Sequence, residues 1–310
     1  MNRAETKTRA GESVATSVFP SRRRPRSWVR VLIYAFLLAG ALAAVTPFVY
    51  MIMTSLKTYG SVINNNIWPW FPFGDEPLQF NNYAEAIDRI GFDKAWGVPL
   101  FVRYLANSII MSSVIVGGVL ITSILAAYVL ARMQVPGKNL VFLFILATIM
   151  IPPDLTLVPK VVMMFNLKWY NTYLALSVPF LTSVFAIFLL RQFFMQIPKD
   201  LYDAARMDGA GHLRFLFFIV VPLSKPAIFT VALLNFIWAW DSFKWPLLVT
   251  RDNNMRVLAV GLQQFLAGEG GTNVQFLMAF ATLVVLPIVI LYFFTQKYFT
   301  EGVITTGLKG

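Results

Sequence analysis

Long apolar stretches separated by polar segments run through this chain of 310 residues. Six of these stretches could form helices that cross a hydrocarbon layer of about 30 Å, although some fall short of the usual length. They are Val31–Met53, Tyr104–Leu130, Leu140–Ile151, Tyr173–Leu190, Pro226–Trp240 and Phe276–Phe294. The pattern predicts an all-α, polytopic membrane protein with six transmembrane helices.

Proline interrupts two of the stretches. The third ends at Pro152 and Pro153, and the fifth begins close to Pro222 and Pro226. Proline fits the first turn of a helix but not its interior. We therefore expect less regular bounds for these two helices than for the other four.

The composition agrees with a membrane protein. Hydrophobic residues make up 57% of the chain, charged residues make up 13%, and the mean hydropathy is +0.65. Soluble domains carry about 25% charged residues. The chain has no cysteine, which excludes disulfides, thiol nucleophiles and cysteine-bound metals.

Residues 1–28 differ from the rest of the chain, because they are polar and rich in Arg, Ser and Thr. Without apolar periodicity they cannot form a core, so we predict a disordered, basic cytoplasmic tail there and a transmembrane domain over residues 29–310. A signal peptide would also place basic residues before an apolar stretch. Val31–Met53 is longer than the roughly 7–15 apolar residues of a signal peptide, which favours an uncleaved anchor.

The formal net charge of +11 is unevenly distributed along the chain. If the N-terminal tail is cytoplasmic, six spans place the C-terminus and the segments near 131–139 and 191–225 on the same side. The excess of Lys and Arg falls on that side, as the positive-inside rule requires. We therefore expect a multi-pass protein of the cell (inner) membrane with both termini in the cytoplasm, and no nucleic acid partner.

The second, third, fourth and sixth stretches contain no Asp, Glu, Lys, Arg or His, and Asp241 stands at the outer end of the fifth. Ion-coupled carriers usually place ionisable groups inside their spans. An ion-coupled secondary transporter nevertheless remains the alternative, because carbonyl groups of broken helices can bind Na⁺.

Enzymatic motifs are also missing from the sequence. There is no HExxH motif and no second histidine beside His212, so we expect no metal site. There is no GxxxxGK[ST] phosphate loop either. The sequence therefore predicts a protein that is not an enzyme and has no cofactor of its own, so any ATP would be bound by a separate chain.

The polar turn between the fourth and fifth stretches, at about residues 198–225, has the features of a docking element. Asp200 is expected to cap a short helix with Asp203 in its first turn. Ala204 and Ala205 would leave one side of this helix bare for another protein, and Gly209 would allow the bend that ends it. An ordinary connection between two membrane helices would look the same, so the spacing alone does not establish docking.

The same segment resembles the EAA signature of ATP-binding-cassette importer permeases, in which E-A-A, three residues, G and nine residues precede I-x-L-P. The chain reads Asp203-Ala204-Ala205, Arg206-Met207-Asp208 and Gly209, and nine residues later Ile219-Val220-Val221-Pro222. Aspartate and valine thus replace the family's glutamate and leucine. The resemblance implies a coupling helix seated in a groove of an ATPase subunit.

The resemblance also implies a role for each matched residue. Asp203 would make an ionic contact, Ala204 and Ala205 would form a close-packing surface, and Asp208 lies within the motif. Gly209 would form the turn, and Pro222 would begin the rigid arm into the fifth span.

Motifs along nearly the whole chain resemble the carbohydrate-type, binding-protein-dependent permeases of the maltose-transporter class. They include PFVYMIMTSLKT, AAYVLARMQVPGK, MIPPDLTLVPK and WAWDSFKWPLLVT, where Asp241 stands in place of an expected asparagine. The resemblance implies a type I importer permease architecture over residues 29–310. It also implies four kinds of partner: two ATPase subunits, a second and usually non-identical permease, an extracytoplasmic solute-binding protein, and membrane lipid.

A sugar, or a related polyol or sugar-phosphate, is the solute that this class implies. Aromatic, amide and hydroxyl side chains bind sugars, so the candidates in the spans are Asn107, Ser108, Asn235, Trp238 and Trp240. The alternative is structural, since Asn and Ser often link membrane helices and Trp often anchors a span at the interface. His212 is interpreted as a polar loop residue, and Arg132 and Lys138 as ordinary basic residues of the cytoplasmic side.

Overall fold

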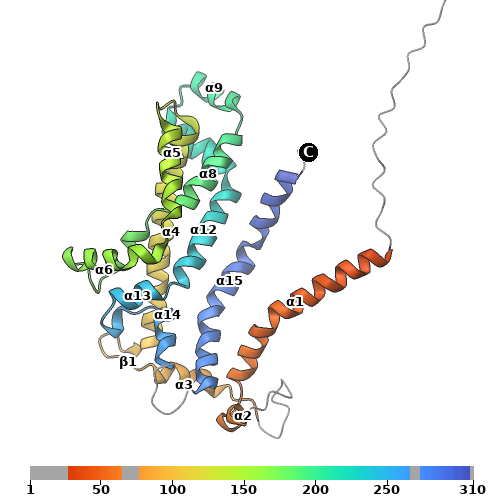
Figure 1. The fold of residues 1–310 in the computed structure, drawn as a ribbon, viewed down its shortest axis with the longest axis vertical. Coiled ribbons are helices and arrows are strands. Elements are labelled where there is room, and N and C mark those ends of the chain that lie inside the picture. The colour runs from red at the N-terminus through yellow and green to blue at the C-terminus, as the bar shows by residue number, and fades with distance from the viewer. Residues whose placement is uncertain (1–26, 65–76, 266–272, 308–310) are drawn as a thin grey trace, which may run out of the picture. The chain divides into compact units, whose positions relative to one another are not determined.

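The computed structural model describes residues 27–64, 77–265 and 273–307 (Figure 1). The predicted tail over residues 1–28 lies outside this part of the chain except for its last two residues. The chain divides into two units, Met1–Phe48 and Val49–Gly310, and helix α1 (Ser27–Ser55) runs through both. The described residues are helical except for turns, loops and one antiparallel hairpin of β1 (Phe92–Asp93) and β2 (Val98–Pro99).

The second unit contains four longer helices and a series of short ones. The longer helices are α4 (Leu100–Arg132), α8 (Val184–Gln196), α12 (Lys225–Trp240) and α15 (Val274–Gly307). The short α-helices are α2 (Tyr59–Ile63), α3 (Asn81–Arg89), α5 (Lys138–Ala147), α6 (Leu157–Asn166), α7 (Tyr173–Ser177), α9 (Lys199–Met207), α10 (His212–Phe215), α11 (Val221–Leu223), α13 (Lys244–Val249) and α14 (Leu258–Leu262). Single turns of 3-10 helix are η1 (Thr148–Met150), η2 (Pro153–Thr156), η3 (Val178–Phe180), η5 (Asn253–Met255) and η6 (Gln263–Phe265), and η4 (Leu216–Val220) is a π-helical turn.

Three helices in the described residues are long and apolar enough to cross a membrane: Trp28–Ser55, Leu100–Arg132 and Val274–Gln296. Three bent pairs of helices reach the same length when their members are taken together. They are Lys138–Met150 with Pro153–Asn166, Tyr173–Phe180 with Val184–Gln196, and His212–Leu223 with Lys225–Trp240. If each bent pair is one span, the chain has the six predicted spans, and the all-α fold class is confirmed.

The bends correct the bounds expected from the sequence. The third stretch does not end at its prolines, because Pro153 opens a new turn and the chain continues as helix to Asn166 at 89° to the first segment. The fourth stretch is bent by 43° between η3 and α8. The fifth stretch, expected over Pro226–Trp240, corresponds to α12, which begins at Lys225 with Pro226 in its first turn, and a break at Ser224 separates it from α11, which contains Pro222.

Helix α4 forms the centre of the second unit, and α8 and α12 pack along it. A side chain at Gly118 would place its Cβ 2.5 Å from Cδ2 of Leu181, so only glycine permits the observed approach of the two segments. Thr122, one turn further along α4, donates to the Leu181 carbonyl at 2.8 Å. The neighbouring Gly117 has open space beside it, so the close approach depends on Gly118 and not on Gly117.

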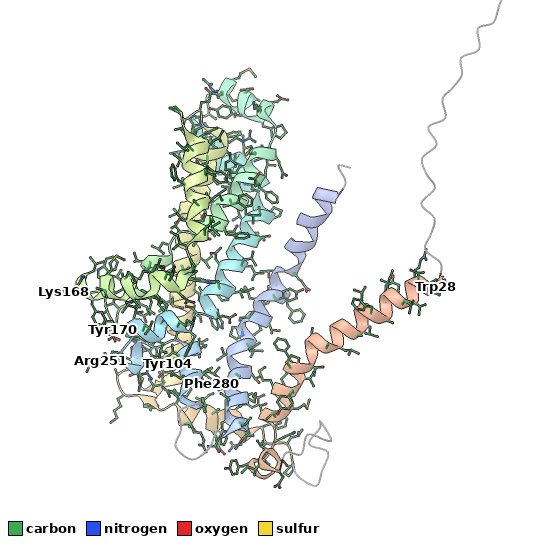
Figure 2. All side chains as sticks on the ribbon, viewed as in Figure 1. Trp28, Tyr104, Lys168, Tyr170, Arg251 and Phe280 are labelled. Atoms are coloured by element: carbon green, nitrogen blue, oxygen red, sulfur yellow. The ribbon has the colours of Figure 1, made fainter. Side chains whose placement is uncertain are left out.

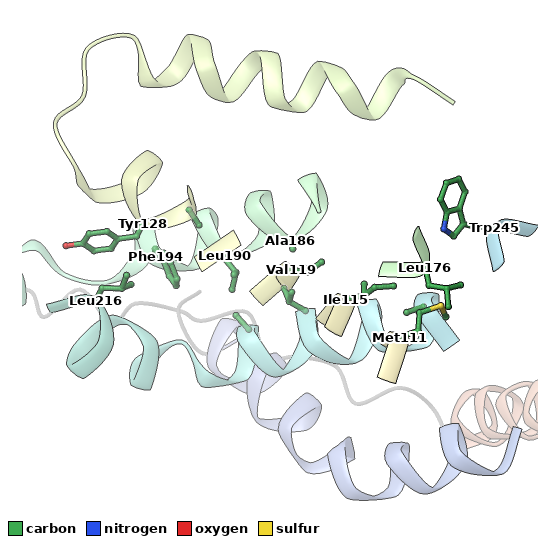
Figure 3. Close-up of a cluster of buried hydrophobic side chains, with 14 of the residues drawn as sticks. Met111, Ile115, Val119, Tyr128, Leu176, Ala186, Leu190, Phe194, Leu216 and Trp245 are labelled. Atoms are coloured by element: carbon green, nitrogen blue, oxygen red, sulfur yellow. The ribbon is translucent and has the colours of Figure 1, made fainter. Parts of the chain in front are cut away.

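Two clusters of buried hydrophobic side chains hold these helices together. The first runs along α4, α8 and α12 and includes Met111, Ile115, Val119, Leu190, Phe194 and Leu216 (Figure 3). The second joins α4 to α14 and α15 through Tyr104, Trp240, Leu258 and Phe280. Figure 2 shows Tyr104 and Phe280 close to the first residues of α4 and α15. Gly261 lies against the Tyr104 ring, where a Cβ would approach Cδ2 to 2.8 Å.

Candidate functional site

Helix α9, the core of the predicted docking element, lies at one end of α4, α8 and α12, and α13 and α14 lie at the other end (Figure 1). It begins at Lys199 after Pro198, whose φ of −55° and ψ of 142° lead the chain into the helix. Asp200 lies in the first turn, where a carboxylate is favoured by the helix dipole. The helix therefore begins two residues earlier than predicted: Pro198, not Asp200, is the N-cap residue, and Asp203 lies beyond the first turn.

Gly209 ends α9 as the sequence predicts. Its φ of +76° is in the left-handed region, which glycine adopts without strain. The amide of Ala210 donates to the Ala205 carbonyl at 2.8 Å, and the amide of Asp208 donates to the Ala204 carbonyl at 3.1 Å. These bonds satisfy the last carbonyl groups of the helix and fix the direction in which the chain leaves it.

The two alanines of the motif lie on different sides of α9. Ala204 is exposed together with Asp203, Met207 and Asp208, and Met207 is 84% accessible. Ala205 is only 6% accessible, because it packs into the first hydrophobic cluster. The close-packing surface expected from both alanines is thus available to another protein at Ala204 but not at Ala205.

His212 links the helix that follows α9 to two other elements. Its Nδ1 lies 3.0 Å from the Tyr128 hydroxyl near the end of α4, and its Nε2 lies 3.3 Å from the Tyr202 hydroxyl on α9. The Tyr202 and His212 rings are also stacked, with centroids 5.6 Å apart. The interpretation of His212 as a simple loop residue was wrong, because its partners are 84 and 10 residues away in the sequence and no local pattern marks them.

Arg132, the last residue of α4, donates from Nη2 to the Ile197 carbonyl, directly before α9. Lys138 donates from Nζ to the Met133 carbonyl at 2.9 Å. Both residues therefore do more than contribute basic charge. Together with the Tyr128–His212 contact, the Arg132 bond attaches both ends of α9 to α4.

Three of the five candidate substrate residues are buried in the chain's own packing. Asn107 donates to the carbonyls of Asn254 and Arg256, both at 2.8 Å, and accepts from the Tyr173 hydroxyl. Ser108 accepts from the Leu258 amide at 2.9 Å. Trp240 donates to the Val284 carbonyl at 3.0 Å. These polar groups already have partners within the chain, which is the structural role that the sequence left open.

The other two candidates, Asn235 and Trp238, face open space. They line a cavity of about 320 Å³ together with Phe180, Thr182, Ser183, Phe185 and Leu234. The Asn235 amide also donates to the Val231 carbonyl within α12. Trp238 is 50% accessible, and its ring meets the Phe180 ring edge to face at 5.1 Å.

Trp238 also borders a second hollow of about 380 Å³, which we call the α12 cavity. It is lined by Pro153, Asp154, Leu157, Lys160, Phe180, Trp238, Asp241, Ser242, Lys244 and Trp245. Phe180 stands between two tryptophans, because its ring also meets the Trp245 ring at 5.3 Å and 85°. The α12 cavity therefore has an aromatic wall, which suits the apolar faces of sugar rings.

Four charged side chains lie around this aromatic wall. Nζ of Lys244 lies 3.2 Å from Oδ1 of Asp154, and Nζ of Lys160 lies 5.5 Å from the centroid of the Phe180 ring. Partial burial raises the pKa of the Asp241 carboxyl above its ordinary value. Sequence reasoning missed Asp154, Lys160 and Phe180, because the 89° and 43° bends bring them to α12 and neither bend was expected.

Comparison with known proteins gives a consistent family. Residues 118–305 match the family model described as the binding-protein-dependent transport system inner membrane component. The chain is 33% identical over 284 residues to the "Arabinooligosaccharides transport system permease protein AraQ" of Halalkalibacterium halodurans. The aligned region covers 92% of this chain and 97% of that relative. The chain is 32% identical over 274 residues to the "sn-glycerol-3-phosphate transport system permease protein UgpE" of Brucella abortus, with 88% and 95% covered.

A solved structure has the same fold. The chain resembles one described as a bacterial ABC transporter involved in the import of the acidic polysaccharide alginate. The TM-score is 0.75 at 24% identity, and the match covers 89% of this chain and 98% of the other. This likeness confirms the expected architecture of a type I importer permease. The chain therefore belongs to the binding-protein-dependent transport system inner membrane components, and it is a membrane-spanning permease subunit of an ATP-binding-cassette importer.

Proposed function

We propose that this permease forms half of the translocation pore for a sugar or a related solute, and that a separate ATPase subunit docks on the coupling loop, residues 198–225. The observation that carries the proposal is α9, a short helix whose motif residues Asp203, Ala204 and Asp208 are exposed, while Ala205 is buried and the residues on either side of the helix are hydrogen-bonded to α4. A helix held in this way can pass on a movement of the protein that grips it.

Each exposed residue of α9 has a physical role in this proposal. Asp203 makes an ionic contact with the ATPase, and Ala204 allows its backbone to come close. Asp208 adds a second negative charge at the end of the helix, beside the bend at Gly209. Pro222 lies in the short helix α11, so its role is to stiffen the connection before the bend at Ser224.

The full importer would contain two ATPase subunits, a second permease chain and an extracytoplasmic solute-binding protein. ATP would be bound by the ATPase subunits, because the permease sequence has no phosphate-binding loop. The excess of basic residues on the side of the coupling loop supports an orientation with α9 and both chain termini in the cytoplasm of an inner-membrane protein. The α12 cavity would then open toward the other side.

A carbohydrate-type solute is supported by two observations. The relatives described above are named for arabinooligosaccharides and for sn-glycerol-3-phosphate. The α12 cavity joins three aromatic rings to charged and hydroxyl groups, which is the chemistry that sugar faces and sugar hydroxyls require. The family assignment favours ATP-driven import over the ion-coupled secondary transporter that the sequence had left open.

The proposal is tested by purifying the complex through a tag on this chain and measuring the retained ATPase activity. The complex with the unmodified chain should retain an ATP-hydrolysing subunit. Asp203→Arg should lose it by charge reversal, and Gly209→Pro should lose it because proline fixes φ near −65° where the chain needs +76°.

Asp88→Arg is the matched control, because Asp88 is exposed on α3 at the opposite end of the second unit. It reverses one charge without touching α9 and should leave the ATPase attached. If Asp203→Arg keeps the ATPase as well as Asp88→Arg does, α9 is not the docking element.

A further inference from the structure

The α12 cavity has a balanced set of charges. Two lysines, Lys160 and Lys244, and two aspartates, Asp154 and Asp241, line it, so its formal charge is zero when all four are ionised. Lys244 is neutralised directly by Asp154 at 3.2 Å. Lys160 lies over the Phe180 ring, whose face attracts a cation.

Asp241 is the carboxylate of this cavity without a close counter-charge. Among the described residues, its carboxylate lies within 4.0 Å of no lysine or arginine nitrogen. It is also the residue that follows the last turn of α12, where the free carbonyl groups of a helix add negative potential. Its raised pKa agrees with a partly desolvated carboxylate that has no cation beside it.

Neutral sugars and anionic sugars would meet this environment differently. A sugar hydroxyl both donates and accepts, so it can bond to an ammonium group and to a carboxylate alike. A phosphate or a uronate accepts bonds and carries negative charge, so it is attracted by Lys160 but repelled by Asp241 and by the end of α12.

We propose that the α12 cavity binds a neutral, polyhydroxylated sugar, and that Asp241 is the specificity-determining residue that disfavours phosphorylated and acidic sugars there. The inference rests on the proposed function, since it assumes that solute passes through this cavity. The relatives named for arabinooligosaccharides and for sn-glycerol-3-phosphate are 33% and 32% identical to this chain, so overall identity does not distinguish a neutral from an anionic solute. The proposed role of Asp241 does, because it favours the neutral one.

The test uses the complete transporter, purified with its ATPase and partner permease but without a solute-binding protein, so that only the membrane complex selects the solute. Arabinotriose is the neutral probe and sn-glycerol-3-phosphate the anionic probe, and each is titrated while tryptophan fluorescence is recorded. Trp238→Phe identifies the part of the signal that comes from the cavity, because Trp238 lines it and is half exposed.

In the unmodified complex we expect arabinotriose to change the Trp238 signal at concentrations about tenfold lower than sn-glycerol-3-phosphate, the effect of one partly solvated charge. Asp241→Asn keeps the shape of the side chain and removes its charge, so it should strengthen binding of the anionic probe several-fold relative to the neutral probe. Asp88→Asn, which removes an exposed charge outside the cavity, should change neither.

Lys160→Gln provides a second test that does not depend on Asp241. It makes the cavity net negative and should weaken the anionic probe further relative to the neutral one. Equal binding of both probes to the unmodified complex, or an unchanged preference in Asp241→Asn, would overturn the inference.

The two proposals fail in different ways. If neither probe alters the Trp238 signal while the ATPase stays attached, this cavity is not the sugar site and the docking proposal stands. If the ATPase itself does not accompany the chain, the proposed function is wrong whatever the probes do.

Discussion

The hydroxyl of Tyr128 lies 3.0 Å from Nδ1 of His212, and this contact joins the end of α4 to the first residue of α10. The Tyr202 ring of α9 stacks on the same imidazole, and its hydroxyl lies 3.3 Å from Nε2. One side chain therefore connects the central helix of the permease to the helix that is proposed to receive the ATPase.

Tyr128→Phe should weaken the transmission of movement without releasing the ATPase. The substitution keeps the ring and removes one hydrogen bond, which contributes about 1 kcal/mol. We expect ATP hydrolysis to continue but solute transported per ATP to fall, measured in proteoliposomes that contain the complete importer. Tyr292→Phe, at an exposed tyrosine of α15, is the control. An unchanged transport-to-hydrolysis ratio in Tyr128→Phe would contradict a coupling role for this contact.

Gly118→Ala should destabilise the packing of α4 against the segment before α8, because the new Cβ would lie 2.5 Å from Cδ2 of Leu181. Overpacking of this kind costs about 1–3 kcal/mol. Thermal unfolding in detergent measures the effect. Gly117→Ala is a closely matched comparison, since its Cβ meets nothing within 4 Å, and it should leave the unfolding temperature nearly unchanged. Equal effects of the two substitutions would mean that the close approach at Gly118 does not limit stability.

Asn107→Ala and Trp238→Ala should affect different properties. The first removes the hydrogen bonds that Asn107 makes to the carbonyls of Asn254 and Arg256 and accepts from the Tyr173 hydroxyl, at about 1 kcal/mol for each bond, so the unfolding temperature should fall. The second removes a half-exposed ring of the α12 cavity, so solute binding should weaken while stability changes little. Thermal unfolding and solute titration on the same preparations separate the two effects. If Asn107→Ala weakened solute binding and left the unfolding temperature unchanged, Asn107 would be a solute-binding residue instead of a structural one.

Asp241 should make the stability of the protein depend on pH. Its pKa is raised in the folded chain, so the folded state holds this proton more tightly than the unfolded state does. The resulting stabilisation is present below the ordinary aspartate pKa of about 3.9, and it is lost as the pH rises through the higher pKa that Asp241 has in the folded state. Asp241→Asn should therefore gain stability relative to the unmodified chain at neutral pH, and the gain should shrink on acidification. Melting temperatures of both proteins across this pH range provide the measurement. A difference in melting temperature between the two proteins that does not change with pH would refute the prediction.

The sequence predicted the number of spans well because apolar length is a local property. Val31–Met53, Tyr104–Leu130 and Phe276–Phe294 each fall within one continuous helix. The bends were not predictable in the same way, since Pro152 and Pro153 mark a break but carry no information about the direction in which the chain continues. For this reason Lys160 and Asp154 were not recognised as neighbours of Trp238.

The coupling loop could be located from its motif, but the motif does not say which side of α9 is exposed. Gly209 has the positive φ that its residue type suggests, whereas Ala205 is covered by the hydrophobic cluster around Phe215. Asn107 is ambiguous for a related reason, because an amide in a span suits either a solute or another helix. Its backbone partners come from a loop almost 150 residues away, which no local pattern indicates.

Helix α9 is held at three places: at Ile197 before it, whose carbonyl accepts from Arg132 of α4, at His212 after it, which contacts Tyr128 of α4, and at Ala205 within it, which packs into the first hydrophobic cluster. Three separate attachment points fix the orientation of a rigid body, whereas two would still allow it to rotate about the line between them. A force applied to the exposed side of α9 therefore cannot be absorbed by swivelling of this helix alone, and it is shared among all three helices that surround the first hydrophobic cluster.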